Sequence, residues 1–288
     1  MFNTLSRSWS LVKASYNVLR SDPELMVLPF ISMLGVLLVS IVFIVPAYFG
    51  GLFDNLGERG DGLTAQNILG LVVLFLYYLV MYTIIIFSNV ALVGAAMMRL
   101  RGEDPTVRDG IRIAMQHLGQ IVGYAAISAT VGLVLKVLRD QDGIIGRILA
   151  FVINIAWTVV TFLVIPVLVV ENVGPIEGIK RSTELLRKTW GEQLVANGGI
   201  GLVLGLITFA VILVVGVPLV LLAAATESAA LIFVAVAIIV LLVMAISLFG
   251  AALNGVFQAA LYNYASTGTA GQGFNEHLVR DAFRPKKR

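Results

Sequence analysis

The stretch Glu171–Gln193, ENVGPIEGIKRSTELLRKTWGEQ, carries eight charged residues in a chain that is otherwise strongly apolar. A charge-free window, 148–170, precedes it, and another, 193–226, follows it. Both windows are longer than the roughly 20 apolar residues that a helix needs to cross the hydrocarbon core of a bilayer. The stretch is therefore predicted to connect two membrane-spanning helices on one side of the membrane.

The whole chain has the composition of a polytopic membrane protein. Of its 288 residues, 59% are hydrophobic and 13% are charged, and the mean hydropathy is +0.95. Soluble globular domains have about 25% charged residues. A β-barrel would show alternating segments of about 10 residues, which this sequence does not show. The absence of cysteine excludes disulfides and a thiol nucleophile.

Six windows contain no Asp, Glu, Lys or Arg, and each is long enough to hold a spanning helix. These windows are 25–53, 62–98, 113–135, 148–170, 193–226 and 228–275. We predict an all-α integral membrane protein with a single transmembrane domain over 1–265. The predicted spans are 25–49, 66–98, 116–137, 145–170, 195–222 and 229–262.

The distribution of Lys and Arg predicts the orientation of these spans. Of the 20 basic residues, 16 fall in the termini and in the loops on their side, and four fall on the other side. Cytoplasmic loops carry the excess of Lys and Arg in membrane proteins. Both termini are therefore expected in the cytoplasm. The four residues of the other side are Arg59, Lys136, Arg139 and Arg147.

The charged stretch itself is predicted to form an interfacial helix over 175–192. Pro175 suits the first position of a helix, because its missing N–H would be unpaired there anyway. Apolar side chains recur at helical spacing on one face, and charged side chains cover the other. Such a helix lies in the membrane interface rather than across the membrane. The apolar face comprises Ile176, Ile179, Leu186 and Trp190.

Two other segments have the same character, and we predict interfacial elbow helices over 2–20 and 105–118. A shift of 174 positions aligns Arg7-Ser8 with Arg181-Ser182 without a gap. One interpretation is a threefold internal repeat of one interfacial helix and two spans. The alternative is that any basic amphipathic helix before a span has this pattern. The apolar stripes are Phe2, Leu5, Trp9, Val12, Tyr16 and Leu19 in the first segment, and Ile111, Met115, Leu118 and Val122 in the second.

The basic and aromatic side chains of this belt are the candidate contacts to lipid headgroups. Each nearby Lys or Arg adds about 1 kcal/mol of attraction to an anionic membrane surface. The alternative is that they only orient and anchor the chain. The segment 266–288 is predicted to be a mobile basic cytoplasmic tail at the membrane surface, and we expect no nucleic-acid partner. The candidates are Arg7, Trp9, Lys13, Arg20, Arg99, Arg101, Lys180, Arg181, Arg187, Lys188 and Trp190.

A few polar or helix-breaking residues fall within the predicted spans. Pro166 and Glu171 could form a gate or an ion site, or Glu171 could be a boundary carboxylate. Asn89, Asn154, Asn254 and Gln258 could line a polar path or form interhelical hydrogen bonds, worth about 0.6 kcal/mol each. Gly201 and Gly205 allow helices to pack closely, within one chain or between copies.

Several short motifs along the chain carry a resemblance to known membrane proteins. These motifs are Thr161-Phe162, Pro166–Asn172, Gly174–Glu177, Lys180–Ser182 and Thr189–Gln193, with Arg7–Trp9 and Asp22–Leu25. On these motifs the sequence resembles a bacterial family of six-span inner-membrane proteins whose domain has no assigned function. More distantly, it is similar to the membrane domain fused to some glycerophosphodiester phosphodiesterases. The resemblance implies a location in the bacterial cytoplasmic (inner) membrane, and it transfers no catalytic residue.

The sequence contains no recognisable catalytic constellation. It lacks a serine nucleophile elbow, a phosphate loop and paired acids within one span, and its two histidines share no metal-ligand spacing. We therefore expect no catalytic residue, no metal, no cofactor and no enzymatic activity. The expected partners are membrane lipids, including anionic ones, and a second copy or another membrane protein. The favoured interpretation is a membrane scaffold or accessory protein, and the alternative is a channel or transporter for a small solute or lipid.

Overall fold

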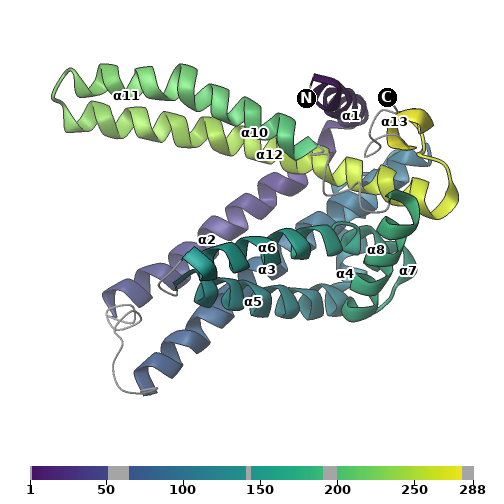
Figure 1. Ribbon diagram of the computed structural model, residues 1–288, viewed down its shortest axis with the longest axis horizontal. Helices are drawn as coiled ribbons and strands as arrows, with labels where there is room; N and C mark the ends of the chain where they lie inside the picture. Colours follow the sequence, from purple (N-terminus) through teal and green to yellow (C-terminus); the bar gives the residue numbers. More distant parts are fainter. Residues whose placement is uncertain (1, 51–64, 141–143, 191–199, 281–288) are drawn as a thin grey trace. The chain divides into compact units, whose positions relative to one another are not determined.

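The computed structural model describes residues 2–50, 65–140, 144–190 and 200–280, and all regular structure within these ranges is helical (Figure 1). Among these residues, six helices are long and apolar enough to cross a membrane, which confirms the number of spans predicted from the charge-free windows. The candidate spans are Pro23–Phe49, Ile68–Leu100, Leu118–Arg139, Ile144–Glu171, Val203–Ala224 and Ala229–Thr267. The predicted start of the fifth span, 195–199, lies outside the described residues.

The first half of the chain contains α1 to α5. A single 3₁₀ turn at Pro23–Met26 links α1 to α2, where proline suits the start of a helix. The helix α3 has 36 residues and is about 54 Å long at 1.5 Å per residue, well beyond the hydrocarbon thickness. The bounds are Phe2–Ser21 for α1, Val27–Phe49 for α2, Ala65–Leu100 for α3, Val107–Gln116 for α4 and Leu118–Asp140 for α5.

The fourth and fifth spans are each interrupted close to a proline. The fourth is divided at 161–163 into α6 (Ile144–Val160) and α7 (Val164–Glu171), with Pro166 in the first turn of α7. The fifth is divided into α10 (Ile200–Val211) and α11 (Val217–Ala224) by a π-helical segment, Ile212–Gly216, just before Pro218. Proline has no N–H to donate and its ring collides with the carbonyl of the preceding turn, so both interruptions have a local cause.

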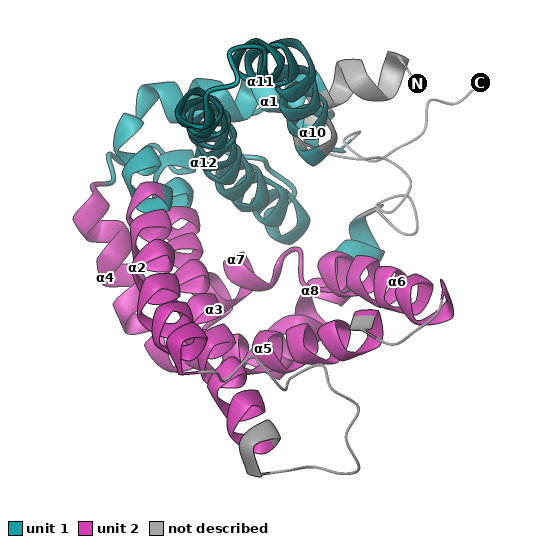
Figure 2. Ribbon diagram, turned by 90° about the vertical axis from the view of Figure 1, so that its left-hand side faces the viewer, with its two compact units in different colours: residues 1–29, 96–105, 186–288 teal, residues 30–95, 106–185 magenta. Residues whose placement is uncertain are grey.

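The remaining helices are α8 (Pro175–Trp190), α12 (Ala229–Thr267) and α13 (Glu276–Arg280). Helices therefore occur in each of the three segments for which elbow helices are predicted, as α1, α4 and α8. Their position at a membrane interface and their relation by an internal repeat stay predictions. The chain groups into two compact units that alternate along the sequence: unit 1 is 1–29, 96–105 and 186–288, and unit 2 is 30–95 and 106–185 (Figure 2).

In unit 2, polar and small side chains join neighbouring spans. The hydroxyls of Ser40 in α2 and Tyr77 in α3 lie 3.2 Å apart, and a Cβ at Gly35 would be 3.1 Å from Ile84. A Cβ at Gly94 of α3 would come within 2.8 Å of Ile113 in α4. Small residues therefore let these helices approach closely, as is typical of membrane bundles.

In unit 1, α1 packs against α10 and α12, and α13 packs against α1 and α12. The connection from α12 to α13 runs past the end of α3, where the N–H of Gln272 donates to the carbonyl of Leu100 at 2.9 Å. Gly271 has a φ of +86°, and a Cβ there would lie 2.9 Å from Leu100, so glycine suits this position on both grounds. Phe274 and Val279 are buried. The predicted mobility of the tail stays a prediction, and 281–288 lie outside the described residues.

Candidate functional site

The turn between α7 and α8 brings Glu171, the one charged residue of α7, beside the charged helix α8. Asn172 ends α7 in the left-handed conformation, with φ of 50°, and its side-chain oxygen accepts a hydrogen bond from Gln120 Nε2 at 2.9 Å. Pro175 then starts α8, and a Cβ at Gly123 of α5 would lie 2.9 Å from the Pro175 ring. The chain thereby reverses direction, and α8 lies against α7.

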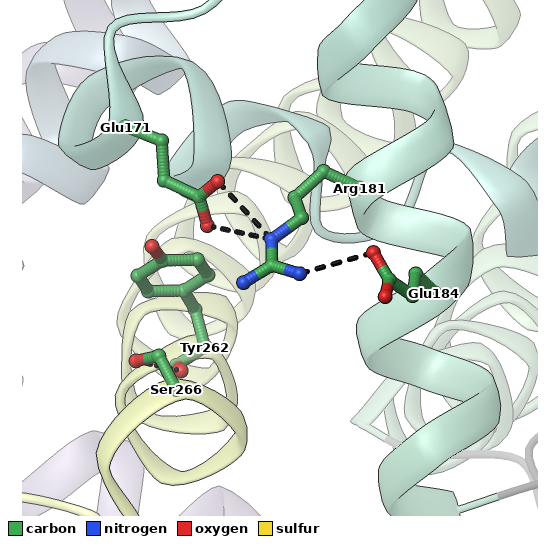
Figure 3. A network of polar contacts seen from close by, with 5 residues as sticks. All are labelled: Glu171, Arg181, Glu184, Tyr262 and Ser266. Carbon is green, nitrogen blue, oxygen red and sulfur yellow. Dashed lines mark hydrogen bonds and ion pairs between the residues drawn. The ribbon is translucent and has the colours of Figure 1, made fainter.

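Glu171 forms an ion pair with Arg181 across this turn (Figure 3). Arg181 Nε donates to both carboxylate oxygens of Glu171, at 3.2 and 3.1 Å, and Nη1 donates to Glu184 at 3.0 Å. Hydrogen bonds to Glu184 and Glu171 raise the pKa of Arg181 above its ordinary value. The i,i+4 spacing within α8 favours Glu177 as the partner of Arg181, but the reversal at 172–174 supplies Glu171 instead.

The same turn places a buried polar contact at the interruption of the fourth span. The backbone N–H of Leu163 donates to Ser182 Oγ of α8 at 3.1 Å, and both residues are fully buried. One turn earlier on α8, a Cβ at Gly178 would lie 3.0 Å from Leu168 Cδ2. The face of α8 that packs on α7 therefore begins with small residues, whereas Ile176 of the predicted apolar stripe is 65% exposed.

Among the three candidate elbow helices, α4 has the clearest separation of faces. Thr106 and Asp109 form a capping box, in which the Thr106 hydroxyl and backbone N–H both donate to the carboxylate. These hydrogen bonds lower the pKa of Asp109. The predicted apolar stripe lies uncovered on the surface, while Arg108 and Arg112 are exposed beside it. Its members are Ile111, Met115, Leu118 and Val122, the last two in α5.

On α1, the predicted stripe is divided between surface and core. Val12 and Leu19 are buried against the rest of unit 1, whereas Trp9 and Tyr16 are 45% and 43% exposed. Lys13 and Arg20 are exposed on the same face as Trp9 and Tyr16. The Lys13 ammonium lies 5.9 Å from the centre of the Trp9 ring, within the range of a cation–π contact.

This exposed face of α1 forms one wall of an apolar groove of about 610 Å³ within unit 1. The other walls are α10, which contributes Ile207, and α12, which contributes Ala245 and Phe249. The rings of Tyr16 and Phe249 meet edge to face, with centroids 6.0 Å apart. The lining is almost wholly apolar, and Lys13 is its one charged residue among those described.

The predicted intramembrane polar residues are scattered through the spans. Asn89 and Asn154 are half-buried in unit 2. The Thr158 hydroxyl, one turn after Asn154 on α6, donates to the backbone carbonyl of Asn154 at 2.8 Å. Asn254 and Gln258 lie one turn apart on α12 and are both half-buried. The spacing i,i+4 puts the last two on one face of their helix.

The predicted packing glycines differ in their surroundings. A Cβ at Gly201 or Gly205 would meet no atom within 4 Å in the part of the chain that the structure describes, so this face of α10 is open there. By contrast, a Cβ at Gly250 of α12 would lie 2.7 Å from Leu204 Cδ1, and this contact brings α10 and α12 together. The glycine that joins these helices is therefore one that the sequence pattern did not single out.

The remaining headgroup candidates occupy different positions. Arg101, Lys180, Arg187 and Lys188 are exposed, while Arg99 is half-buried and pairs with Asp104 at 3.4 Å. The side chains of Arg7 and Trp190 lie outside the described residues. In the described part of the chain, no group of three or more His, Asp or Glu could hold a metal ion.

The number and apolarity of the spans define an α-helical polytopic membrane protein. Residues 68–274 match a family model described as "Family of unknown function (DUF6159)", so the match covers most of the chain. The chain belongs to this family. No curated protein matches the chain.

Proposed function

We propose that this protein resides in the bacterial cytoplasmic membrane with both termini in the cytoplasm, and acts there as a non-enzymatic scaffold or accessory protein. In this proposal it works through contacts with membrane lipids and through self-association. The observation that carries the proposal is the uncovered apolar stripe of α4 beside exposed arginines. A helix with these two faces binds at the boundary between headgroups and acyl chains.

The basic residues around this helix favour a surface that attracts anionic lipid. Arg108 and Arg112 are exposed on α4, and Arg101 precedes it. Each such residue near an anionic membrane surface contributes about 1 kcal/mol of attraction. The apolar stripe would thus set the depth of α4 in the membrane, and the arginines would give the chain a preference for anionic lipids.

The open face of α10 supports the self-association in this proposal. Gly201 and Gly205 are one turn apart, and a Cβ at either position would meet no atom of the described residues within 4 Å. Small residues at this spacing allow two backbones to approach closely in a membrane. A second copy of the chain is the partner that we propose for this face.

The proposed threefold repeat has support from the burial pattern of α4 and α8. The buried positions Gly110 and Ala114 on α4, and His117 directly after it, match Gly178, Ser182 and Leu185 on α8 after a shift of 68 residues. Two helices that bury equivalent positions are consistent with two copies of one unit.

Cysteine labelling on this cysteine-free chain tests the placement of α4. Arg112→Cys should react with a water-soluble maleimide applied to inverted membrane vesicles, because its face meets water. Met115→Cys should be protected, because its side chain would lie among acyl chains. Equal and rapid labelling of the two variants would mean that α4 is not interfacial, and the lipid-contact proposal would lose its support.

A channel or transporter for a small solute or lipid is the second candidate, favoured by the two interrupted spans. Non-helical backbone at membrane depth is tolerated where protein buries it or where it lines a water-filled cavity. Asn254 and Gln258 would then face the path. Cysteines introduced at both positions should react with a small water-soluble reagent if this candidate is right, and should stay unreactive if the scaffold proposal is right.

A further inference from the structure

The groove in unit 1 has the size and the apolar lining of a site for a flexible apolar chain. Its volume of about 610 Å³ falls within the range of small-molecule sites, roughly 300–1,000 Å³. Ala245 leaves room in the wall contributed by α12, and the Tyr16–Phe249 ring pair supplies a flat aromatic surface. A saturated or monounsaturated acyl chain needs only such apolar contacts.

The groove also has one charged residue, which would interact with a polar group at one end of the ligand. The Lys13 side chain is exposed, and its ammonium is held near the Trp9 ring. A lysine amine beside a tryptophan is a typical arrangement at the level of phospholipid headgroups. The charge is positive, so the complementary group is an anion such as a phosphodiester.

The surface of α10 and α12 around the groove indicates a ligand that arrives from the bilayer rather than from water. Leu206 and Phe209 of α10 and Leu241 of α12 are each at least half exposed. Such apolar side chains would lie among the lipids in a spanning helix pair. A membrane lipid could therefore enter sideways without crossing a polar surface.

We propose that this groove, formed by α1, α10 and α12, binds one acyl chain of an anionic phospholipid, and that the Lys13 ammonium binds its phosphate. The proposal rests on the proposed membrane location and lipid contacts, and it adds a defined site and a lipid class. Bound there, the lipid connects α1 to the hairpin of α10 and α12. Lipids that only surround the protein, without a defined site, would not connect these helices.

Quenching of Trp9 fluorescence by brominated lipid tests this site directly. The chain has three tryptophans, so W157F/W190F retains Trp9 alone. The purified full-length variant in nonionic detergent is titrated with phosphatidylglycerol brominated on its acyl chains, and separately with brominated phosphatidylcholine. Bromine quenches tryptophan only at close range. We expect saturable quenching at low lipid-to-detergent ratios, with phosphatidylglycerol binding the more tightly.

Two matched substitutions on α12 locate the site of quenching. In the Trp9-only background, A245F should fill the groove and abolish the saturable phase. A230F makes the same change at an exposed position 15 residues away on the same helix, outside the groove, and should leave quenching unchanged. Equal saturable quenching in A245F and A230F would overturn the proposal.

The charge of Lys13 is tested by K13Q, a surface change that leaves the groove open. Because one lysine near an anionic lipid contributes about 1 kcal/mol, the affinity for phosphatidylglycerol should fall about fivefold. The affinity for phosphatidylcholine should fall less, because its choline cation offsets the charge of its phosphate. An unchanged preference for phosphatidylglycerol would show that Lys13 does not bind the phosphate.

Native mass spectrometry of the same samples separates failure of the site from failure of the proposed function. Retained phosphatidylglycerol without quenching of Trp9 would overturn the groove site and leave the general lipid contacts in place. A protein that retains no anionic lipid would overturn both. A loss of oligomer in A245F, with lipid retention unchanged, would show that a second copy occupies the groove and would overturn the lipid site.

Discussion

Ser182 of α8 accepts a hydrogen bond from the backbone N–H of Leu163, 19 residues earlier, where the fourth span is interrupted. The interruption leaves this donor without a carbonyl partner in its own helix, and a buried unpaired N–H is costly. The hydroxyl of α8 satisfies it. A buried polar contact thereby joins the charged helix α8 to the interrupted fourth span, in addition to the Glu171–Arg181 ion pair.

Removal of this hydroxyl should destabilise the protein. Ser182→Ala leaves the Leu163 N–H buried without an acceptor, which costs about 1–3 kcal/mol. We expect a lower midpoint of thermal unfolding in detergent. Thr183→Ala is the control, because the Thr183 hydroxyl donates to Ile179 within its own helix. The control should change stability by no more than about 0.5 kcal/mol. Equal midpoints for the two variants would contradict the role of Ser182.

The close packing of α8 on α7 makes a second prediction. Gly178→Leu would force side-chain atoms into Leu168 and Val164, where even a Cβ is 3.0 Å from Leu168 Cδ2. Overpacking of this kind costs about 1–3 kcal/mol. Gly119→Leu places the same side chain at a helical glycine with open space around it. Thermal unfolding should distinguish the two, and a Gly178→Leu protein as stable as Gly119→Leu would argue against this packing.

The pH dependence of stability should depend on Asp22 in unit 1. Asp22 is 5% exposed, and its Oδ2 has no hydrogen-bond partner among the described residues. Burial raises its pKa above 3.8, the nearby Asp104 and Glu24 act in the same direction, and Arg99 opposes them. The folded state therefore holds this proton more tightly than the unfolded state does.

Linkage between protonation and folding gives the direction in which stability changes with pH. A raised pKa in the folded state means that stability falls as the pH rises from 3.8 to the raised value, and stays lower above it. Asp22→Asn should flatten this part of the profile of unfolding midpoint against pH. Glu24→Gln removes only a minor contribution to the raised pKa of Asp22, so its profile should keep most of the slope. A slope that survives in Asp22→Asn would assign the effect to other groups.

The open glycine face of α10 predicts that a large side chain there reduces self-association without lowering the stability of the fold. A Cβ at position 205 would meet no atom of the described residues within 4 Å, so we expect Gly205→Leu to maintain the unfolding midpoint of the monomer. The same change would block close approach of a second copy. Cross-linking in membranes should therefore yield fewer dimers for Gly205→Leu than for Gly119→Leu. An undiminished dimer yield would exclude this face from self-association.

The sequence predicts the number of spans well because charge is excluded from the hydrocarbon over whole helices, as in the window 25–53. Pro166 likewise indicates an interruption of the fourth span. The hydrophobic pattern does not predict that Ser182 accepts a hydrogen bond from the backbone N–H at this interruption. The contact depends on a single hydroxyl group, which leaves no trace in that pattern. Similarly, Gly178 is identified only by the proximity of Leu168, a long-range contact.

The features that sequence reasoning missed arise from contacts between distant segments. The groove in unit 1 combines α1 with helices about 200 residues later, and no local pattern contains that information. The stripe on α1 is divided for the same reason, because packing buries Val12 and leaves Trp9 exposed. The π-helical segment before Pro218 has a local indication in Gly216 and Pro218.

Native mass spectrometry of the protein extracted with its native lipids tests the central claim most directly. If the protein is a scaffold that acts through lipid contacts and self-association, the spectrum should show a defined oligomer that retains anionic phospholipid in fixed stoichiometry. A monomer free of retained lipid would contradict both parts of the claim, and would favour a pathway within a single chain.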